Sequence, residues 1–86
     1  YGLEADAVVH LRDGRYALIE FTLGSREIDD GAKHLLELKR LVVQHNEKET
    51  QMPIRVPDLL MIITGGSIAY TREDGVRVVP LACLKD

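Results

Sequence analysis

Two carboxylates near the start of the chain, Asp6 and Glu20, have the residue types and the spacing that could do chemistry. They lie in two short apolar runs, residues 4–11 and 15–22, which are joined by Arg12-Asp13-Gly14. Two such runs on either side of a glycine-containing turn are typical of a β-hairpin. What the carboxylates can do therefore depends on the register in which the two strands pair.

Two loop lengths give different registers. A two-residue loop of Asp13 and Gly14 would place the two carboxylates on opposite faces of the hairpin. A three-residue loop, with Arg12 and Asp13 in a type I turn and Gly14 in the left-handed region, sets Asp6 opposite Glu20. It also gathers an almost wholly apolar set on the other face: Ala5, Ala7, Val9, Leu11, Ala17, Ile19 and Phe21. Because this segregation favours the longer loop, we expect the carboxylates side by side, about 5 Å apart at Cβ.

A carboxylate pair of this kind suits a divalent cation. Two carboxylates so close repel each other unless a cation, a proton or a partner group lies between them. Mg²⁺ and Mn²⁺ prefer such oxygen ligands completed by water, and a bound ion can activate water for phosphodiester cleavage. A lysine two residues after Glu20 would normally stabilise the developing charge. The chain has Thr22 at that position.

Other titratable side chains are weaker candidates. Arg26 and Lys33, near the start of the expected helix, could supply the missing cation, but solvated surface charge is the simpler interpretation. His34 and His45 have no third ligand at metal-binding spacing, so neither is predicted to bind a metal. His10 is interpreted as packing at the end of the hairpin.

The elements that must position these residues follow from periodicity. Residues 27–47 carry apolar side chains at spacings of three and four, which predicts an amphipathic helix. Residues 59–64 are uniformly apolar, as in a parallel strand buried on both faces. Residues 68–71 and 76–81 predict a second hairpin, with Pro80 placing the last strand at an edge. The expected helix stripe consists of Ile28, Ala32, Leu35, Leu38 and Val42. We therefore expect an α/β fold with core order β-β-α-β-β, a mixed sheet and one crossover helix.

Length and composition limit the function classes. The 86 residues allow one domain, 1–86, and their 45% apolar content is globular. A net charge of −3 argues against a general nucleic-acid footprint, although Arg12, Arg15 and Arg77 could form a local basic patch. The single cysteine, Cys83, excludes a disulfide framework, and no segment reads as a signal or a membrane span. These absences lead us to expect a cytoplasmic protein. Because the chain begins at Tyr1 without methionine, we also expect it to be a piece of a longer protein.

Several motifs together resemble a known family. They are Glu4-Ala5-Asp6, Asp13-Gly14, Tyr16-Ala17-Leu18-Ile19-Glu20, Leu23-Gly24, Pro57-Asp58, Ile63-Thr64-Gly65-Gly66, Ala69-Tyr70, Arg72-Glu73-Asp74-Gly75-Val76, Val79-Pro80 and Cys83-Leu84. The set is similar to the C-terminal domain of unknown function of bacterial and archaeal AAA-type P-loop ATPases. That domain in turn resembles the PD-(D/E)XK, restriction-endonuclease-like superfamily.

The resemblance implies a truncated restriction-endonuclease-like core. In it Asp6 would be the metal-binding aspartate, Glu20 the acidic residue of the E-x-K motif, and Glu4 an additional acidic position. Thr22 departs from the motif where the lysine belongs. ATP would bind only in an upstream domain, since these residues contain no P-loop sequence.

Three functions stay open from the sequence. One is a nuclease-like accessory or docking domain of an ATPase that is not an enzyme and requires no cofactor. The second is a Mg²⁺- or Mn²⁺-dependent DNA endonuclease that uses Asp6 and Glu20. The third is a purely structural interaction or dimerisation module. The incomplete motif favours the first, with the rest of the ATPase chain as partner and a second copy or DNA as alternatives. Exposed apolar sheet also predicts self-association of the isolated chain.

Overall fold

A five-stranded sheet and one long helix build the fold in the computed structural model, which describes residues 5–24, 26–48 and 55–84. In sequence order the elements are β1 (Ala7–His10), β2 (Tyr16–Thr22), α1 (Arg26–Lys48), β3 (Leu59–Thr64), β4 (Tyr70–Thr71), β5 (Arg77–Pro80) and the 3₁₀ helix η1 (Leu81–Leu84). The order β-β-α-β-β-β is one strand longer than the expected core, because both strands of the second hairpin join the sheet. The expected α/β class is confirmed.

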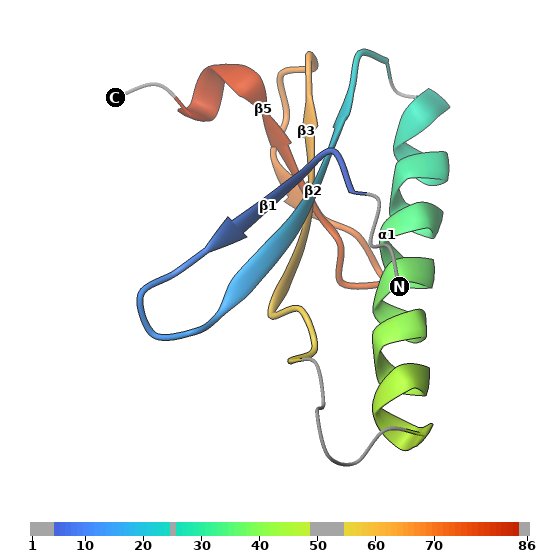
Figure 1. Ribbon diagram of the computed structural model, residues 1–86. Coiled ribbons are helices and arrows are strands. Elements are labelled where there is room, and N and C mark those ends of the chain that lie inside the picture. The colour runs from blue at the N-terminus through green and yellow to red at the C-terminus, as the bar shows by residue number, and fades with distance from the viewer. Residues whose placement is uncertain (1–4, 25, 49–54, 85–86) are drawn as a thin grey trace.

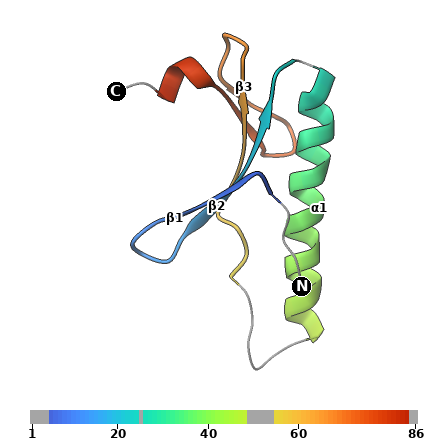
Figure 2. The same ribbon diagram turned by 45° about the horizontal axis from the view of Figure 1, so that its top comes forward.

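The sheet is mixed, with strand order β1-β2-β3-β5-β4. The three inner strands β2, β3 and β5 run parallel, and each outer strand pairs antiparallel with its hairpin partner. The helix α1 connects β2 to β3 and lies along one face of this sheet (Figures 1 and 2). A parallel pair needs such a crossover, because a short turn can join only antiparallel strands.

The two hairpins close in the same way. In the first, the Gly14 N–H donates to the Leu11 carbonyl at 3.1 Å and Gly14 takes a φ of 93°. In the second, the Gly75 N–H donates to the Arg72 carbonyl at 3.0 Å and Gly75 takes a φ of 89°. Each is a type I turn followed by a left-handed glycine, which is the three-residue loop expected for the first hairpin. That expectation is confirmed.

The core lies between α1 and the sheet. The buried residues of α1 are the predicted stripe: Ile28, Ala32, Leu35, Leu38 and Val42. Leu18, Leu60, Ile62 and Val78 meet this stripe from the three parallel strands. Among the described helices, none combines the length and the apolar character needed to cross a bilayer.

Asp58 fixes the start of the parallel pairing between β2 and β3. Its carboxylate accepts the Tyr16 N–H at 3.0 Å, and its own N–H donates to the Tyr16 carbonyl at 3.0 Å. The Arg55 guanidinium holds the same carboxylate with two bonds of 3.1 Å. That guanidinium and the Tyr16 N–H together lower the pKa of Asp58.

The position of the last strand differs from expectation. β5 lies between β3 and β4, so the edge strand is β4. Pro80 is tolerated inside the sheet because β4 pairs only with Arg77 and Val78 and ends before the proline is reached. The missing N–H of Pro80 therefore deprives no neighbour of a ladder bond on that side.

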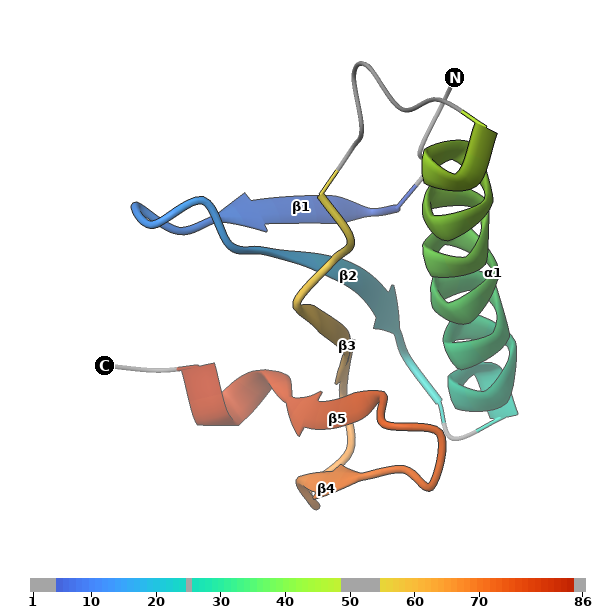
Figure 3. The same ribbon diagram turned by 90° about the horizontal axis from the view of Figure 1, so that it is seen from below.

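The second face of the sheet differs from the face under α1. Leu60 and Ile62 of β3 are buried beneath the helix, as expected, but Leu59 and Met61 on the other face are only half-buried. Seen from below, the β1–β2 hairpin and η1 both project to the side away from α1 (Figure 3). Ile63, further along the same face as Met61, is buried, so burial of β3 on both faces is confirmed at its carboxyl end and only on the helix side at its start.

Candidate functional site

The register of the first hairpin brings the two candidate carboxylates together. Ala7 pairs with Ile19 and Val8 with Leu18, so the neighbouring positions Asp6 and Glu20 face each other. The Asp6 Oδ2 accepts the Phe21 N–H at 2.9 Å, which anchors this carboxylate just beyond the end of β1. The predicted juxtaposition is confirmed.

The surroundings of the two carboxyl groups differ. Asp6 is exposed, and the Phe21 N–H, followed by the contact with Glu20, lowers its pKa. Glu20 is only 8% exposed, and this burial, followed by the contact with Asp6, raises its pKa although His34 acts in the opposite direction. A proton that enters this pair is therefore held preferentially by Glu20.

His34 is the third member of the cluster, which we call the acid–histidine cluster (Asp6, Glu20 and His34). Its Nδ1 contacts Oε1 of Glu20 directly, from the flank of the buried stripe on α1. The sequence interpretation missed this role because it tested the histidines only as metal ligands. A signal was present: a glutamate on the helix-facing side of a strand needs a polar partner on the helix.

Thr22 lies on the same face of β2 as Glu20, at the position where the motif has lysine. Its Oγ1 is buried and has no hydrogen-bond partner among the described residues. Gly31 of α1 lies close by, and a Cβ at that glycine would stand 3.6 Å from the Thr22 methyl group. The motif's lysine position is therefore a packed contact between strand and helix.

The remaining candidates lie apart from this cluster. Arg26 and Lys33 are exposed on α1, as expected for solvated surface charge. His10 stacks on the ring of Tyr16 with a centroid distance of 5.5 Å, which confirms its packing role at the hairpin end. Glu4, the additional acidic candidate, lies outside the described residues.

One oxygen of Asp6 accepts a backbone N–H and one oxygen of Glu20 contacts the imidazole, so each carboxylate of the acid–histidine cluster has one oxygen engaged in these contacts and a second oxygen outside them. In residues 5–24, 26–48 and 55–84, no group of three or more His, Cys, Asp or Glu side chains is arranged to hold a metal ion.

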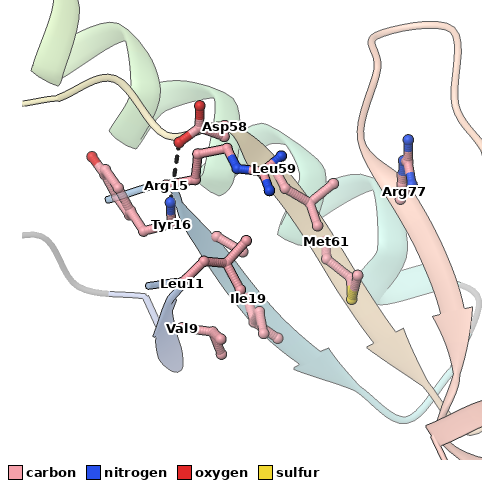
Figure 4. A pocket seen from close by; sticks show the side chains of 10 residues that line it. Val9, Leu11, Arg15, Tyr16, Ile19, Asp58, Leu59, Met61 and Arg77 are labelled. Carbon is pink, nitrogen blue, oxygen red and sulfur yellow. Dashed lines mark hydrogen bonds between the residues drawn. The ribbon is translucent and has the colours of Figure 1, made fainter. Parts of the chain in front are cut away.

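A second feature lies on the sheet face opposite α1. An open groove of about 370 Å³ runs over β2 and β3, with a floor of Ala17, Ile19, Leu59 and Met61 (Figure 4). Val9 and Leu11 of the first hairpin continue this apolar lining. The side chains of Arg15, which directly precedes β2, and Arg77 of β5 also line the groove (Figure 4).

Searches among protein-family models, curated proteins and solved structures find no match to this chain.

Proposed function

We propose that this chain is a nuclease-like accessory domain of an ATPase that acts by docking and does not cleave DNA. The proposal joins the motif resemblance to the PD-(D/E)XK superfamily with the mixed sheet and its crossover helix. A truncated restriction-endonuclease-like core is the finer fold assignment that goes with it. The ATP site would belong to an upstream domain.

One observation carries the non-catalytic half of the proposal: the buried Glu20 carboxylate is satisfied by neighbouring side chains. His34 contacts one of its oxygens, and Asp6 lies beside it. A catalytic carboxylate that binds an ion must leave oxygens free toward solvent and substrate. Thr22 packs against α1 at the position of the motif's lysine, so that position supplies no cation to stabilise developing charge.

The docking half of the proposal rests on the open sheet face. Parallel strands are normally covered on both faces, and a contiguous apolar surface on a domain marks an interaction site. The strands β2 and β3 carry α1 on one face and present the groove floor on the other. A surface of this kind is suited to binding another protein element.

A plasmid-nicking assay with Mn²⁺ tests the non-catalytic half. We expect supercoiled plasmid to stay intact with the wild-type chain, with Asp6→Ala and with Glu20→Ala. Asp30→Ala, an exposed carboxylate at the start of α1, is the matched control. Cutting by the wild-type chain that Asp6→Ala and Glu20→Ala abolish, and Asp30→Ala does not, would establish the endonuclease alternative.

Deletion of these residues from the full ATPase tests the docking half. We expect the deletion to change partner or DNA binding while basal ATP hydrolysis stays measurable. A deletion that altered only the solubility of the parent protein would contradict a docking role and would favour a purely structural module.

A further inference from the structure

The sheet face opposite α1 is apolar in successive register rows. One row consists of Val9, Ala17 and Leu59, and the next of Ala7, Ile19, Met61 and Arg77. A third row consists of Phe21, Ile63 and Val79. Arg77 is therefore the single charged member of the three rows, and the rest form a continuous apolar surface.

This surface is still accessible in its outer part. Val9 is 45% exposed, Leu11 50% and Phe21 53%, although Ile19 at the centre of the face is buried. Of the described helices, α1 packs on the opposite face, and η1 reaches this face only at its corner through Leu81. The exposed apolar side chains thus surround a buried centre, as in a shallow trough.

Two guanidinium groups line the trough although the chain as a whole is negative. Arg15, which directly precedes β2, and Arg77 of β5 line it. The Arg15 guanidinium is paired with the Asp13 carboxylate at 2.7 Å, whereas no ion pair joins Arg77 to a carboxylate of the described residues. The one lining carboxylate, Asp58, is held by the Arg55 guanidinium. A chain with a net charge of −3 therefore presents the unpaired guanidinium of Arg77, together with the Arg15 guanidinium that Asp13 shares, around an apolar floor.

We propose that this trough, defined by the groove floor with Arg15 and Arg77, binds an amphipathic helix of a partner protein that carries carboxylates beside its apolar stripe. The inference rests on the docking role proposed above and specifies the chemistry of the partner. A helix buries an apolar stripe against a sheet face, and flanking glutamates or aspartates would reach the two guanidinium groups. Arginine pairs with carboxylates in this way at the rims of interfaces.

Other occupants match the trough less well. A second copy seated face to face would bring four guanidinium groups around one shared interface, which opposes tight pairing. A nucleic acid would place phosphates over an apolar floor that offers no donors apart from the two arginines. An added strand would pair at the edge of β1 and leave the face uncovered.

Two synthetic helical peptides test this proposal with the whole chain. Both carry the same leucine stripe, and they differ only in flanking residues, glutamate in one and lysine in the other. Fluorescence anisotropy measures binding, and amide chemical shifts locate it. We expect the glutamate peptide to bind, with shifts concentrated in β2 and β3, and we expect added salt to weaken it.

Charge reversal provides the matched variants. Arg77→Glu should weaken the glutamate peptide by about five- to tenfold and strengthen the lysine peptide. Lys39→Glu makes the same charge change on the exposed side of α1, in the other layer, and should leave both affinities unchanged. The reciprocal change in the two peptides separates lost attraction from any loss of folding, which circular dichroism checks directly.

Several results would overturn the proposal. Equal affinity for the two peptides would contradict a role for the arginine charges in binding. Chemical-shift changes outside β2 and β3 would show that the peptide binds elsewhere. Absence of binding together with a tight dimer through the same face would make a second copy the occupant. These results are distinct from plasmid nicking, which bears only on the non-catalytic role of the acid–histidine cluster.

Discussion

Glu20 occupies an unusual position for a carboxylate, since it lies under a helix with another carboxyl group on one side and an imidazole on the other. Its burial disfavours the ionised form, and His34 partly offsets this. Asp6, outside the core, is stabilised in its ionised form by the Phe21 N–H. The pKa values of these two adjacent acids are thus shifted in opposite directions, so their contributions to stability can be separated by experiment.

Substitution of each acid by its amide should reveal these directions. Because the pKa of Glu20 is raised on folding, the folded chain binds the extra proton, and the free energy of unfolding falls as pH rises through the window above the ordinary glutamate pKa. The Glu20→Gln variant has no carboxyl group to ionise at this position, so it does not lose this stability. Its free energy of unfolding relative to that of the wild type should therefore increase as pH rises. Chemical denaturation at a series of pH values measures the difference.

Asp6→Asn should show the opposite trend. The lowered pKa of Asp6 contributes stability that is present above the ordinary aspartate pKa and is lost as pH falls through the lowered value. The variant should be less stable than the wild type at neutral pH, and the deficit should shrink on acidification. Parallel pH profiles of Asp6→Asn and Glu20→Gln would show that the two groups have been assigned wrongly.

The buried hydroxyl of Thr22 gives a separate prediction. Its Oγ1 lacks a partner among the described residues, so the nearly isosteric Thr22→Val should raise the free energy of unfolding by about 1 kcal/mol. Thr22→Ser keeps the hydroxyl, loses the methyl group against α1, and serves as the control that should destabilise. A Thr22→Val variant less stable than the wild type would indicate that the hydroxyl has a partner.

At the scale of elements, α1 contains a glycine where a larger residue would fit. A Cβ at Gly31 would meet the nearest atoms, Cδ1 of Ile62 and Cγ2 of Thr22, at 3.5 and 3.6 Å, which are ordinary contacts. Gly31→Ala should therefore stabilise the protein by about 0.5–1 kcal/mol through helix propensity. Thermal unfolding measures the gain, and Gly14→Ala should destabilise instead, because Gly14 has a φ of 93°.

Sequence patterns were sufficient for most elements because each pattern has a local cause. The helix stripe follows from the 3.6-residue period, and the register of the first hairpin follows from separating polar from apolar residues around one turn. The place of β5 could not be derived in this way. Either strand of the second hairpin could pair with β3 on sequence grounds, and the structure places β5 there with the two-residue β4 outside it.

The acid–histidine cluster also shows which contacts the sequence can predict and which it cannot. Pairing of Asp6 with Glu20 is a property of one hairpin and was predicted. The contact of His34 with Glu20 depends on how α1 is rotated over the sheet, which the stripe determines only to within a residue or so. A buried acid on a strand that faces a helix was the available signal.

For the whole molecule, the arginines of the open face lead to a prediction about self-association of the chain. Two copies meeting through this face would oppose like charges, so self-association should be weak at low salt and should increase as salt screens the repulsion. Sedimentation velocity at fixed protein concentration measures it. Met61→Asp, which places a charge on the groove floor, should abolish the association, whereas Lys39→Glu should not.

The salt response distinguishes this association from helix binding, which salt should weaken. Strong self-association at low salt that falls on adding salt would contradict the expected repulsion. It would also show that the two guanidinium groups find carboxylates on a neighbouring copy.

The bond between the Tyr16 N–H and Asp58 joins residues 42 positions apart, and this separation bears on the order of folding. A hairpin needs only a short loop to close, whereas the parallel ladder of β2 and β3 requires a long segment to be brought back first. Substitutions in the first hairpin should therefore slow refolding, and Val78→Ala in β5 should mainly hasten unfolding. Stopped-flow kinetics would reveal which half of the sheet nucleates.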